Sequence, residues 1–211
     1  MHVKNLVLVL STIKTAPGRL TYAPRSVFSH AERLEQTKST LVSVREKIPD
    51  SHVLFVDATG GEELRDFYDL WLQPRDEKIA WEVNSPIKGL GEAALLEFAL
   101  EWIDKCETLT FDNLWKINGR YSLTRDFSID RWNPTLSEAH FYNPSSVCTV
   151  LYKICPADFS AFKKFVSDSK AKFCGRVPPG MESVYSEFPF RHIPVLGVCG
   201  KVAVSGEDWT R

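Results

Sequence analysis

The sequence predicts an α/β protein with one central, mostly parallel mixed sheet flanked by helices, as in Rossmann-like domains. Two observations lead to this prediction. Short, continuously apolar segments at 5–13 and 52–57 are typical of strands that are covered on both faces. In addition, predicted strands and helices alternate over the first 120 residues, an order that favours parallel strands joined by crossover helices.

The first half supplies four predicted strands and the helices between them. Leu34, Leu41 and Ile48 recur at seven-residue spacing among charged residues, which indicates an amphipathic helix. The carboxyl ends of parallel strands meet at one edge of a sheet, where ligands bind. The predicted strands are 5–13, 52–57, 78–83 and 110–117, and the predicted helices lie within 27–48, 62–71 and 84–105.

The second half is less regular. It contains an alternating strand at 146–154, a helix at 158–173 with apolar residues on one face, a short helical segment within 180–190 and a final apolar strand within 193–206. No linker or internal repeat interrupts the chain. We therefore expect one domain over 1–211, with a nucleotide-binding half at 1–125 and an acceptor or sugar half at 126–211.

Composition excludes some classes of function. The 211 residues carry a formal net charge of −1, so there is no overall basic field for nucleic acid or an anionic membrane. The five cysteines include no CxxC pair, which favours reduced thiols over a disulfide framework or a zinc knuckle. The apolar run from Leu6 to Leu10 is too short for a membrane span. We expect a cytoplasmic protein without a membrane span.

Two predicted strand ends carry side chains suited to a nucleoside. Ser11 and Thr12 follow the first strand, where a hydroxyl can bond a base or ribose or simply end the strand. Asp57 ends the second strand, and an acid there suits a ribose hydroxyl or a base N–H. The alternative for Asp57 is a cap for the turn "ATGG".

The segment "KGLGEA" at 88–93 places Lys88, Gly89 and Gly91 at the start of a predicted helix. Glycines permit close backbone approach, and a helix N-terminus with a lysine attracts phosphate. The segment matches neither the Walker A loop nor GxGxxG. A simple helix start is the alternative interpretation.

The segment "KINGRY" at 116–121 is the most specific feature. Alternation along the strand puts Lys116, Asn118 and Arg120 on one face. Two cations in an apolar neighbourhood are costly unless an anion meets them. That anion is either a ligand or an internal partner such as Asp126 or Asp130.

Further candidates for acid–base or metal chemistry lie downstream. The acids are Asp126, Asp130, Glu182 and Glu187, and His192 precedes the last apolar segment. A single histidine is more often structural than a metal ligand, and Glu182 can serve only to favour a helix N-terminus.

Together these features resemble the GT-A type glycosyltransferases that use nucleotide-diphospho-sugars. In that family a first strand ends in a hydroxyl-bearing loop, a second ends in an acid that reads the base, and a Gly-rich loop begins a helix near the diphosphate. The next strand ends in an Asp-x-Asp metal motif, and here Asn118-Gly119-Arg120 stands in that place. Protein cations can then replace part of the metal's role at the diphosphate.

A narrower resemblance is to a group of viral and bacterial glycosyltransferase domains, among them N-terminal domains of multidomain chlorella-virus proteins associated with capsid glycans. The shared motifs are R-x-x-Q-T, here with Arg33 and Gln36, K-G-x-G-E and K-I-x-G-R-Y. The resemblance covers about residues 5–125 well. It implies one domain of a larger polypeptide, in host-cell cytoplasm if viral.

The resemblance implies transfer of a hexose or deoxyhexose, such as glucose or rhamnose, from a UDP-sugar to a glycan or glycoprotein acceptor. Mn²⁺ or Mg²⁺ is the usual family cofactor, and Asn118 and His192 are the metal candidates. The predicted catalytic residues are Arg120, Asp130 and Glu182, and the predicted donor-binding residues are Ser11, Thr12, Arg33, Asp57, Lys88, Gly89, Lys116, Asn118 and Gly119.

Two other interpretations of the sequence stay open. One is a different Rossmann-like, nucleotide-dependent transferase, although the first strand lacks the following Gly-rich turn of a dinucleotide site. The other is a non-catalytic nucleotide-sugar binding module, which the missing Asp-x-Asp motif favours.

Overall fold

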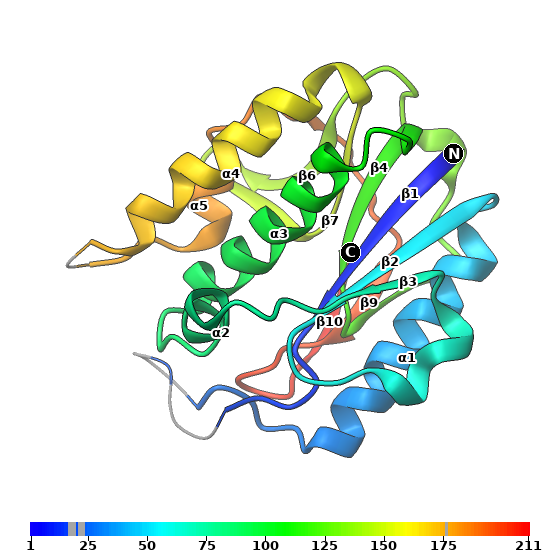
Figure 1. Cartoon of the computed structure of the whole chain (residues 1–211). Coiled ribbons are helices and arrows are strands. Elements are labelled where there is room, and N and C mark those ends of the chain that lie inside the picture. Colours follow the sequence, from blue (N-terminus) through cyan, green and yellow to red (C-terminus); the bar gives the residue numbers. More distant parts are fainter. Residues whose placement is uncertain (17–19, 21–23, 176) are drawn as a thin grey trace.

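A seven-stranded mixed sheet forms the centre of the protein, in a computed structural model that describes residues 1–16, 20, 24–175 and 177–211 (Figure 1). The sheet order is β3-β2-β1-β4-β7-β6-β8, in which the first four strands are parallel and β7 is antiparallel to both its neighbours. This confirms the predicted α/β class. The strands are β1 (His2–Ser11), β2 (Ser51–Asp57), β3 (Leu70–Leu72), β4 (Thr110–Asn118), β6 (Glu138–Asn143), β7 (Ser146–Ile154) and β8 (Arg191–His192).

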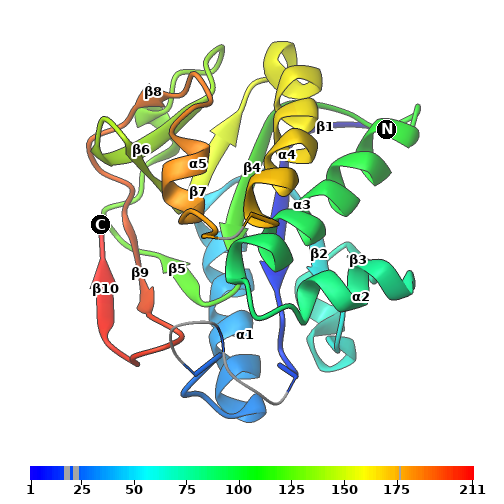
Figure 2. The ribbon, with the colours of Figure 1, turned by 90° about the vertical axis from the view of Figure 1, so that its left-hand side faces the viewer.

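Helices cover both faces of this sheet (Figures 1 and 2). One face carries α1 (His30–Lys47), and the other carries α3 (Lys88–Lys105), α4 (Phe159–Phe173) and α5 (Met181–Tyr185). Along β1, Leu6, Leu8 and Leu10 enter the core beneath α3 while the alternate valines enter the core beneath α1. The strand is thus buried on both faces, which explains its continuous apolar sequence.

A second, three-stranded sheet packs beside the first, with the order β10-β9-β5 (Figure 2). Its strands are β5 (Tyr121–Leu123), β9 (Val198–Lys201) and β10 (Asp208–Thr210). Since β5 follows β4 after only two residues, this sheet brings the last part of the chain next to the end of β4. The remaining elements are α2 (Glu77–Val83) and the 3₁₀ turns Glu62–Phe67, Ile129–Arg131 and Pro156–Asp158.

Helix α1 begins with a capping box that fixes the start of the helix. The Ser29 hydroxyl accepts a hydrogen bond from the Glu32 backbone N–H at 3.3 Å, and the Glu32 carboxylate accepts one from the Ser29 N–H at 2.7 Å. Such a cap contributes about 1 kcal/mol to helix stability. Arg33 follows directly, so the cap also fixes the position of a residue predicted to bind the donor.

The third predicted strand is wrong. Residues 78–83 form most of helix α2, and the strand that pairs with β2 is β3, at Leu70–Leu72. The Asp76 carboxylate accepts hydrogen bonds from the N–H groups of Lys78 and Ile79 and so starts a helix. A short apolar run alone does not distinguish the two structures.

The nucleotide and acceptor halves predicted from the sequence share one sheet, because β4 pairs with β7 across that boundary. In the described part of the chain, no helix has the length and apolar character needed to cross a membrane.

Candidate functional site

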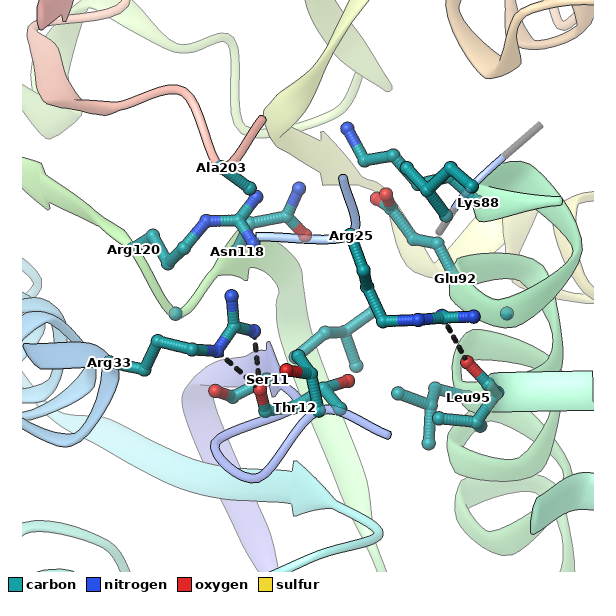
Figure 3. A pocket seen from close by; sticks show the side chains of 16 residues that line it. Ser11, Thr12, Arg25, Arg33, Lys88, Glu92, Leu95, Asn118, Arg120 and Ala203 are labelled. Carbon is teal, nitrogen blue, oxygen red and sulfur yellow. Dashed lines mark hydrogen bonds between the residues drawn. The ribbon is translucent and has the colours of Figure 1, made fainter. Parts of the chain in front are cut away.

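A pocket lies at the carboxyl ends of β1 and β4 (Figure 3). In the sheet, β2 and β3 lie on one side of β1, whereas β4 lies on its other side. The order of the strands therefore reverses between β1 and β4. Ligands in open α/β sheets bind at such points. The described lining is Leu10, Ser11, Thr12, Thr15, Leu20, Arg25, Arg33, Val83, Lys88, Gly91, Glu92, Leu95, Asn118, Gly119, Arg120 and Ala203.

Gly119 allows the ends of β1 and β4 to approach closely at the floor of the pocket. Its N–H donates to the Leu10 carbonyl at 2.8 Å. A Cβ atom at position 119 would lie 2.9 Å from the Ser11 Cβ, which is closer than two carbons can sit. The Ser11 hydroxyl bonds the Thr37 hydroxyl of α1 at 3.0 Å, so it also ties the floor to the helix.

Arg33 forms one wall and is only 4% exposed. Its guanidinium donates to the Thr12 carbonyl from Nε at 2.8 Å and also from Nη2, and Nη1 donates to the Ser26 hydroxyl at 3.2 Å. These partners are neutral, so they do not balance the charge. Burial and then repulsion from Arg120 lower the pKa of Arg33 to about 10, and a weaker attraction from the buried Asp57 opposes this change. The guanidinium is still protonated at neutral pH.

Arg120 directs its guanidinium toward the same space from the end of β4 (Figure 3). Its Nε is buried and has no hydrogen-bond partner among the described residues. Lys88 faces it from the start of α3, whose first turn receives no cap from any side chain in the described ranges. A buried donor without a partner is costly, and a helix N-terminus favours anions, so both features indicate an anionic ligand.

Arg25 adds a fourth cation at the rim. It donates to the carbonyls of Val83, Asn84 and Ser85, at 3.3, 2.6 and 2.8 Å respectively, and thereby closes the end of α2. Across the described residues, none of Arg25, Arg33, Lys88 and Arg120 forms an ion pair with a carboxylate. The described lining therefore carries four cations and one carboxylate, an excess of positive charge.

Glu92 is the one carboxylate in the described lining, and Lys116 neutralises it. The Lys116 ammonium, 1% exposed, lies 2.5 Å from Glu92 Oε1 and also donates to the Thr149 carbonyl. Burial raises the pKa of Glu92, but attraction from Lys116 and Lys88 outweighs it and holds that pKa below its ordinary value. For Lys116 the internal ion-pair alternative therefore holds, with Glu92 of α3 as the partner in place of Asp126 or Asp130.

The pocket brings together seven of the predicted site residues and leaves the others outside its lining. Lys116 lies beneath it, bonded to Glu92. The seven are Ser11, Thr12, Arg33, Lys88, Asn118, Gly119 and Arg120.

Asp57 is fully buried and braces two loops. One carboxylate oxygen accepts from the Ile13 N–H at 2.8 Å, and the other accepts from the N–H and hydroxyl of Thr59, both at 2.7 Å, and from the Gly60 N–H at 3.1 Å. Burial raises the pKa of Asp57, and these bonds oppose the rise. This is the turn-capping alternative, and the carboxylate does not line the pocket in the described chain.

A second hollow adjoins the first and contains Gly89 and Glu182. Lys88 and Glu92 line both hollows, while Pro178, Pro179 and Gly180 complete the wall beside Glu182. Packing explains the glycine at position 89, since a Cβ atom there would lie 2.7 Å from the Phe173 ring. Glu182 is thus the predicted acid that lies next to the pocket.

The two predicted metal ligands do not come together. His192 of β8 is in register with Ala139 of β6, Ala139 with Tyr152 of β7, and Tyr152 with Lys116 of β4, so three strand spacings separate His192 from β4. At about 4.8 Å per strand, His192 is therefore roughly 14 Å from the β4 strand that carries Asn118. Its ring accepts a hydrogen bond from the Phe141 N–H at 3.2 Å.

The residues present do not fit a Mn²⁺ or Mg²⁺ site. No group of three His, Cys, Asp or Glu side chains converges anywhere in the described ranges. In the pocket itself, Glu92 is bonded to Lys116, and the surrounding cations would repel a metal ion. Asp130, the other predicted acid, lies exposed on the 3₁₀ turn Ile129–Arg131, outside the pocket lining.

Sequence reasoning missed Glu92, Arg25 and Ala203. For Glu92 a signal exists, since it is the acid of "KGLGEA" and a buried lysine on the next strand needs a carboxylate partner. Arg25 and Ala203 lie in irregular segments far apart in the chain, where no periodicity indicates their position.

No protein-family model matches this chain, and no curated protein sequence matches it. Among solved structures, it is similar to mouse xyloside xylosyltransferase 1 in its apo form, with 9% sequence identity and a TM-score of 0.44. The similarity covers 92% of this chain and 85% of that one. A TM-score below 0.5 gives this likeness no weight in the functional argument.

Proposed function

We propose that this protein is a glycosyltransferase that binds a UDP-sugar in the pocket at the ends of β1 and β4. The observation that carries the proposal is the set of four cations, Arg25, Arg33, Lys88 and Arg120, around one pocket without carboxylate partners in the described chain. The diphosphate of a nucleotide sugar supplies the missing negative charge. The strand-order reversal beneath the pocket and the open first turn of α3 support the same ligand.

In the proposed reaction, the bond between the sugar C1 and the diphosphate oxygen breaks, and an acceptor hydroxyl oxygen bonds to C1. Arg120 and Lys88 stabilise the negative charge that develops on the departing diphosphate. Glu182, which lines the adjoining hollow, accepts the proton of the acceptor hydroxyl in this proposal.

Glucose and rhamnose are the donor sugars we propose, and a glycan or glycoprotein is the proposed acceptor. The resemblance of "KGLGEA" and "KINGRY" to viral and bacterial glycosyltransferase domains supports this choice and a role in capsid glycan synthesis.

The test is release of UDP from UDP-glucose and UDP-rhamnose, measured with and without glycan acceptors. We expect acceptor-dependent release, and a loss of at least about tenfold in Arg120→Gln because one charge-assisted contact to the leaving group is removed. Arg125→Gln is the matched control, since Arg125 is 94% exposed and lies outside the pocket lining. Absence of acceptor-dependent release with every donor would contradict the proposal.

A further inference from the structure

Two guanidinium groups, those of Arg33 and Arg120, approach each other across the pocket (Figure 3). Their mutual repulsion is strong enough to lower the pKa of Arg33, after the effect of burial. Proteins rarely hold two cations together in a half-buried place unless an anion binds between them. Neither group pairs with a carboxylate within the described ranges.

The arrangement around Arg120 is already set for a ligand. Its Nε is buried with no partner among the described residues, although a guanidinium normally satisfies its buried donors. Asn118 and Gly119, which precede it, are held by pairing with β1, so the Arg120 backbone starts from a fixed strand end. Arg33 is fixed from the other side through its bonds to the Thr12 carbonyl.

A divalent cation has no comparable place in this pocket. The only carboxylate of the described lining is Glu92, and Lys116 lies 2.5 Å from one of its oxygens. A metal ion bound there would have to displace the buried ammonium, which has no other carboxylate within reach in the described chain. The donor set therefore favours an oxyanion rather than a metal.

We propose that the pocket binds the diphosphate of its ligand without a divalent cation, through Arg33 and Arg120 with Lys88 at the N-terminus of α3. This inference rests on the proposed function, because it takes the donor to be a nucleoside diphosphate. It differs from the Mn²⁺ or Mg²⁺ dependence that the sequence resemblance implies. The guanidinium groups take the place of the metal as the positive charge at the diphosphate.

The test is calorimetric titration of UDP into the full chain, in EDTA and in Mn²⁺, together with titration of Mn²⁺ alone. We expect the same affinity for UDP in both buffers and no binding of Mn²⁺ to the free protein. Affinity should fall as salt is raised, since the contacts are between ions. Inorganic diphosphate should compete with UDP, because the proposed contacts are to phosphate oxygens.

Substitutions of single residues identify which side chains bind the diphosphate. Arg120→Gln should weaken UDP binding about ten- to hundredfold in EDTA, and Arg33→Gln should do the same. Arg125→Gln should bind like the wild type. Arg33→Gln also removes hydrogen bonds to the Thr12 carbonyl, so circular dichroism checks that this variant folds. If Arg33→Gln does not fold, the result for Arg120→Gln alone decides the test.

The outcomes separate the two proposals. UDP binding that appears only with Mn²⁺ would overturn this inference and leave the proposed function intact. Absence of UDP binding in both buffers would contradict the proposed function itself. Unchanged affinity in Arg120→Gln would also overturn the inference, because the buried Nε of that guanidinium has no partner among the described residues and the proposal gives it the diphosphate as partner.

Discussion

Asp57 is a residue that the sequence suggests for ligand binding but whose carboxylate is fully occupied by hydrogen bonds to neighbouring loops. The sequence suggested either a nucleoside contact or a turn cap. Four hydrogen bonds to its carboxylate support the second interpretation. A charged side chain at a strand end therefore predicts a ligand site only when nearby backbone N–H groups do not already occupy that side chain.

We expect Asp57→Asn to lower the free energy of unfolding by about 1–3 kcal/mol, because an amide cannot accept all of these bonds and leaves a buried N–H unpaired. The affinity for UDP should change little. Urea denaturation and calorimetry measure the two effects, with the exposed Asp126→Asn as control. A large loss of affinity at unchanged stability would instead show that Asp57 contacts the nucleoside.

The pair of Lys116 and Glu92 shows that local sequence can predict the direction of a side chain but not its partner. Alternation along β4 predicted correctly that Lys116 points to the face opposite Trp115 and Ile117. Asp126 and Asp130 were the internal partners considered, whereas the actual partner lies on α3, and local sequence patterns do not show which helix packs over a strand. The sequence does indicate that a buried lysine needs an acidic partner, but not which acid supplies it.

At the scale of elements, most helices and strands followed from periodicity. The first two strands, α1, α3, β4, β7 and α4 agree with prediction within a few residues. The failure at 78–83 came from overlooking the Asp76 cap. Strand β8 was missed because it has only two residues and is held by pairing with β6, and β6 was missed because its pairing with β7 contains register shifts. Local sequence identifies an element well only when that element is long or strongly capped.

The junction between β1 and β4 depends on Gly119, and we expect Gly119→Ala to separate the two strand ends. A new Cβ would lie 2.9 Å from the Ser11 Cβ and 3.3 Å from the Leu10 carbonyl oxygen, neither of which is the end of a flexible chain. The expected loss of stability is about 1–3 kcal/mol. UDP binding should weaken as well, because Asn118 and Arg120 flank the shifted residue.

Gly175→Ala is the matched control for this variant, since its nearest described neighbour, the Lys172 carbonyl oxygen, would lie at 3.5 Å. Thermal unfolding and UDP titration of both variants make the comparison. Wild-type behaviour of Gly119→Ala would mean that the strand ends are not in the close contact described here.

For the whole molecule, the Glu92–Lys116 pair predicts how stability depends on pH. The folded state holds the pKa of Glu92 below its ordinary value of 4.5, so the unfolded chain binds more protons as the solution becomes acidic. The pair therefore stabilises the fold above about pH 4.5, and this contribution is lost as pH falls toward the lowered pKa.

Glu92→Gln should be about 3 kcal/mol less stable than the wild type at pH 7, because it leaves the buried Lys116 ammonium without its counter-ion. The difference should shrink as pH falls from 4.5 toward the lowered pKa, where the wild-type carboxylate of the folded state also becomes neutral. Urea unfolding from pH 3 to pH 7 measures it, with the half-exposed Glu101→Gln as control. A constant difference across that range would contradict the assignment.

The pocket takes its walls from nearly the whole length of the chain, from Leu10 to Ala203. The Ala203 carbonyl accepts a hydrogen bond from the Val27 N–H at 2.8 Å, and β9 just before it pairs with β5 beside the end of β4. During translation, the four parallel strands, the last of which ends at Asn118, thus leave the ribosome well before Ala203 does. The complete pocket therefore requires the segment around Ala203, and a nascent polypeptide has to fold the parallel strands before that segment can help to hold a nucleotide.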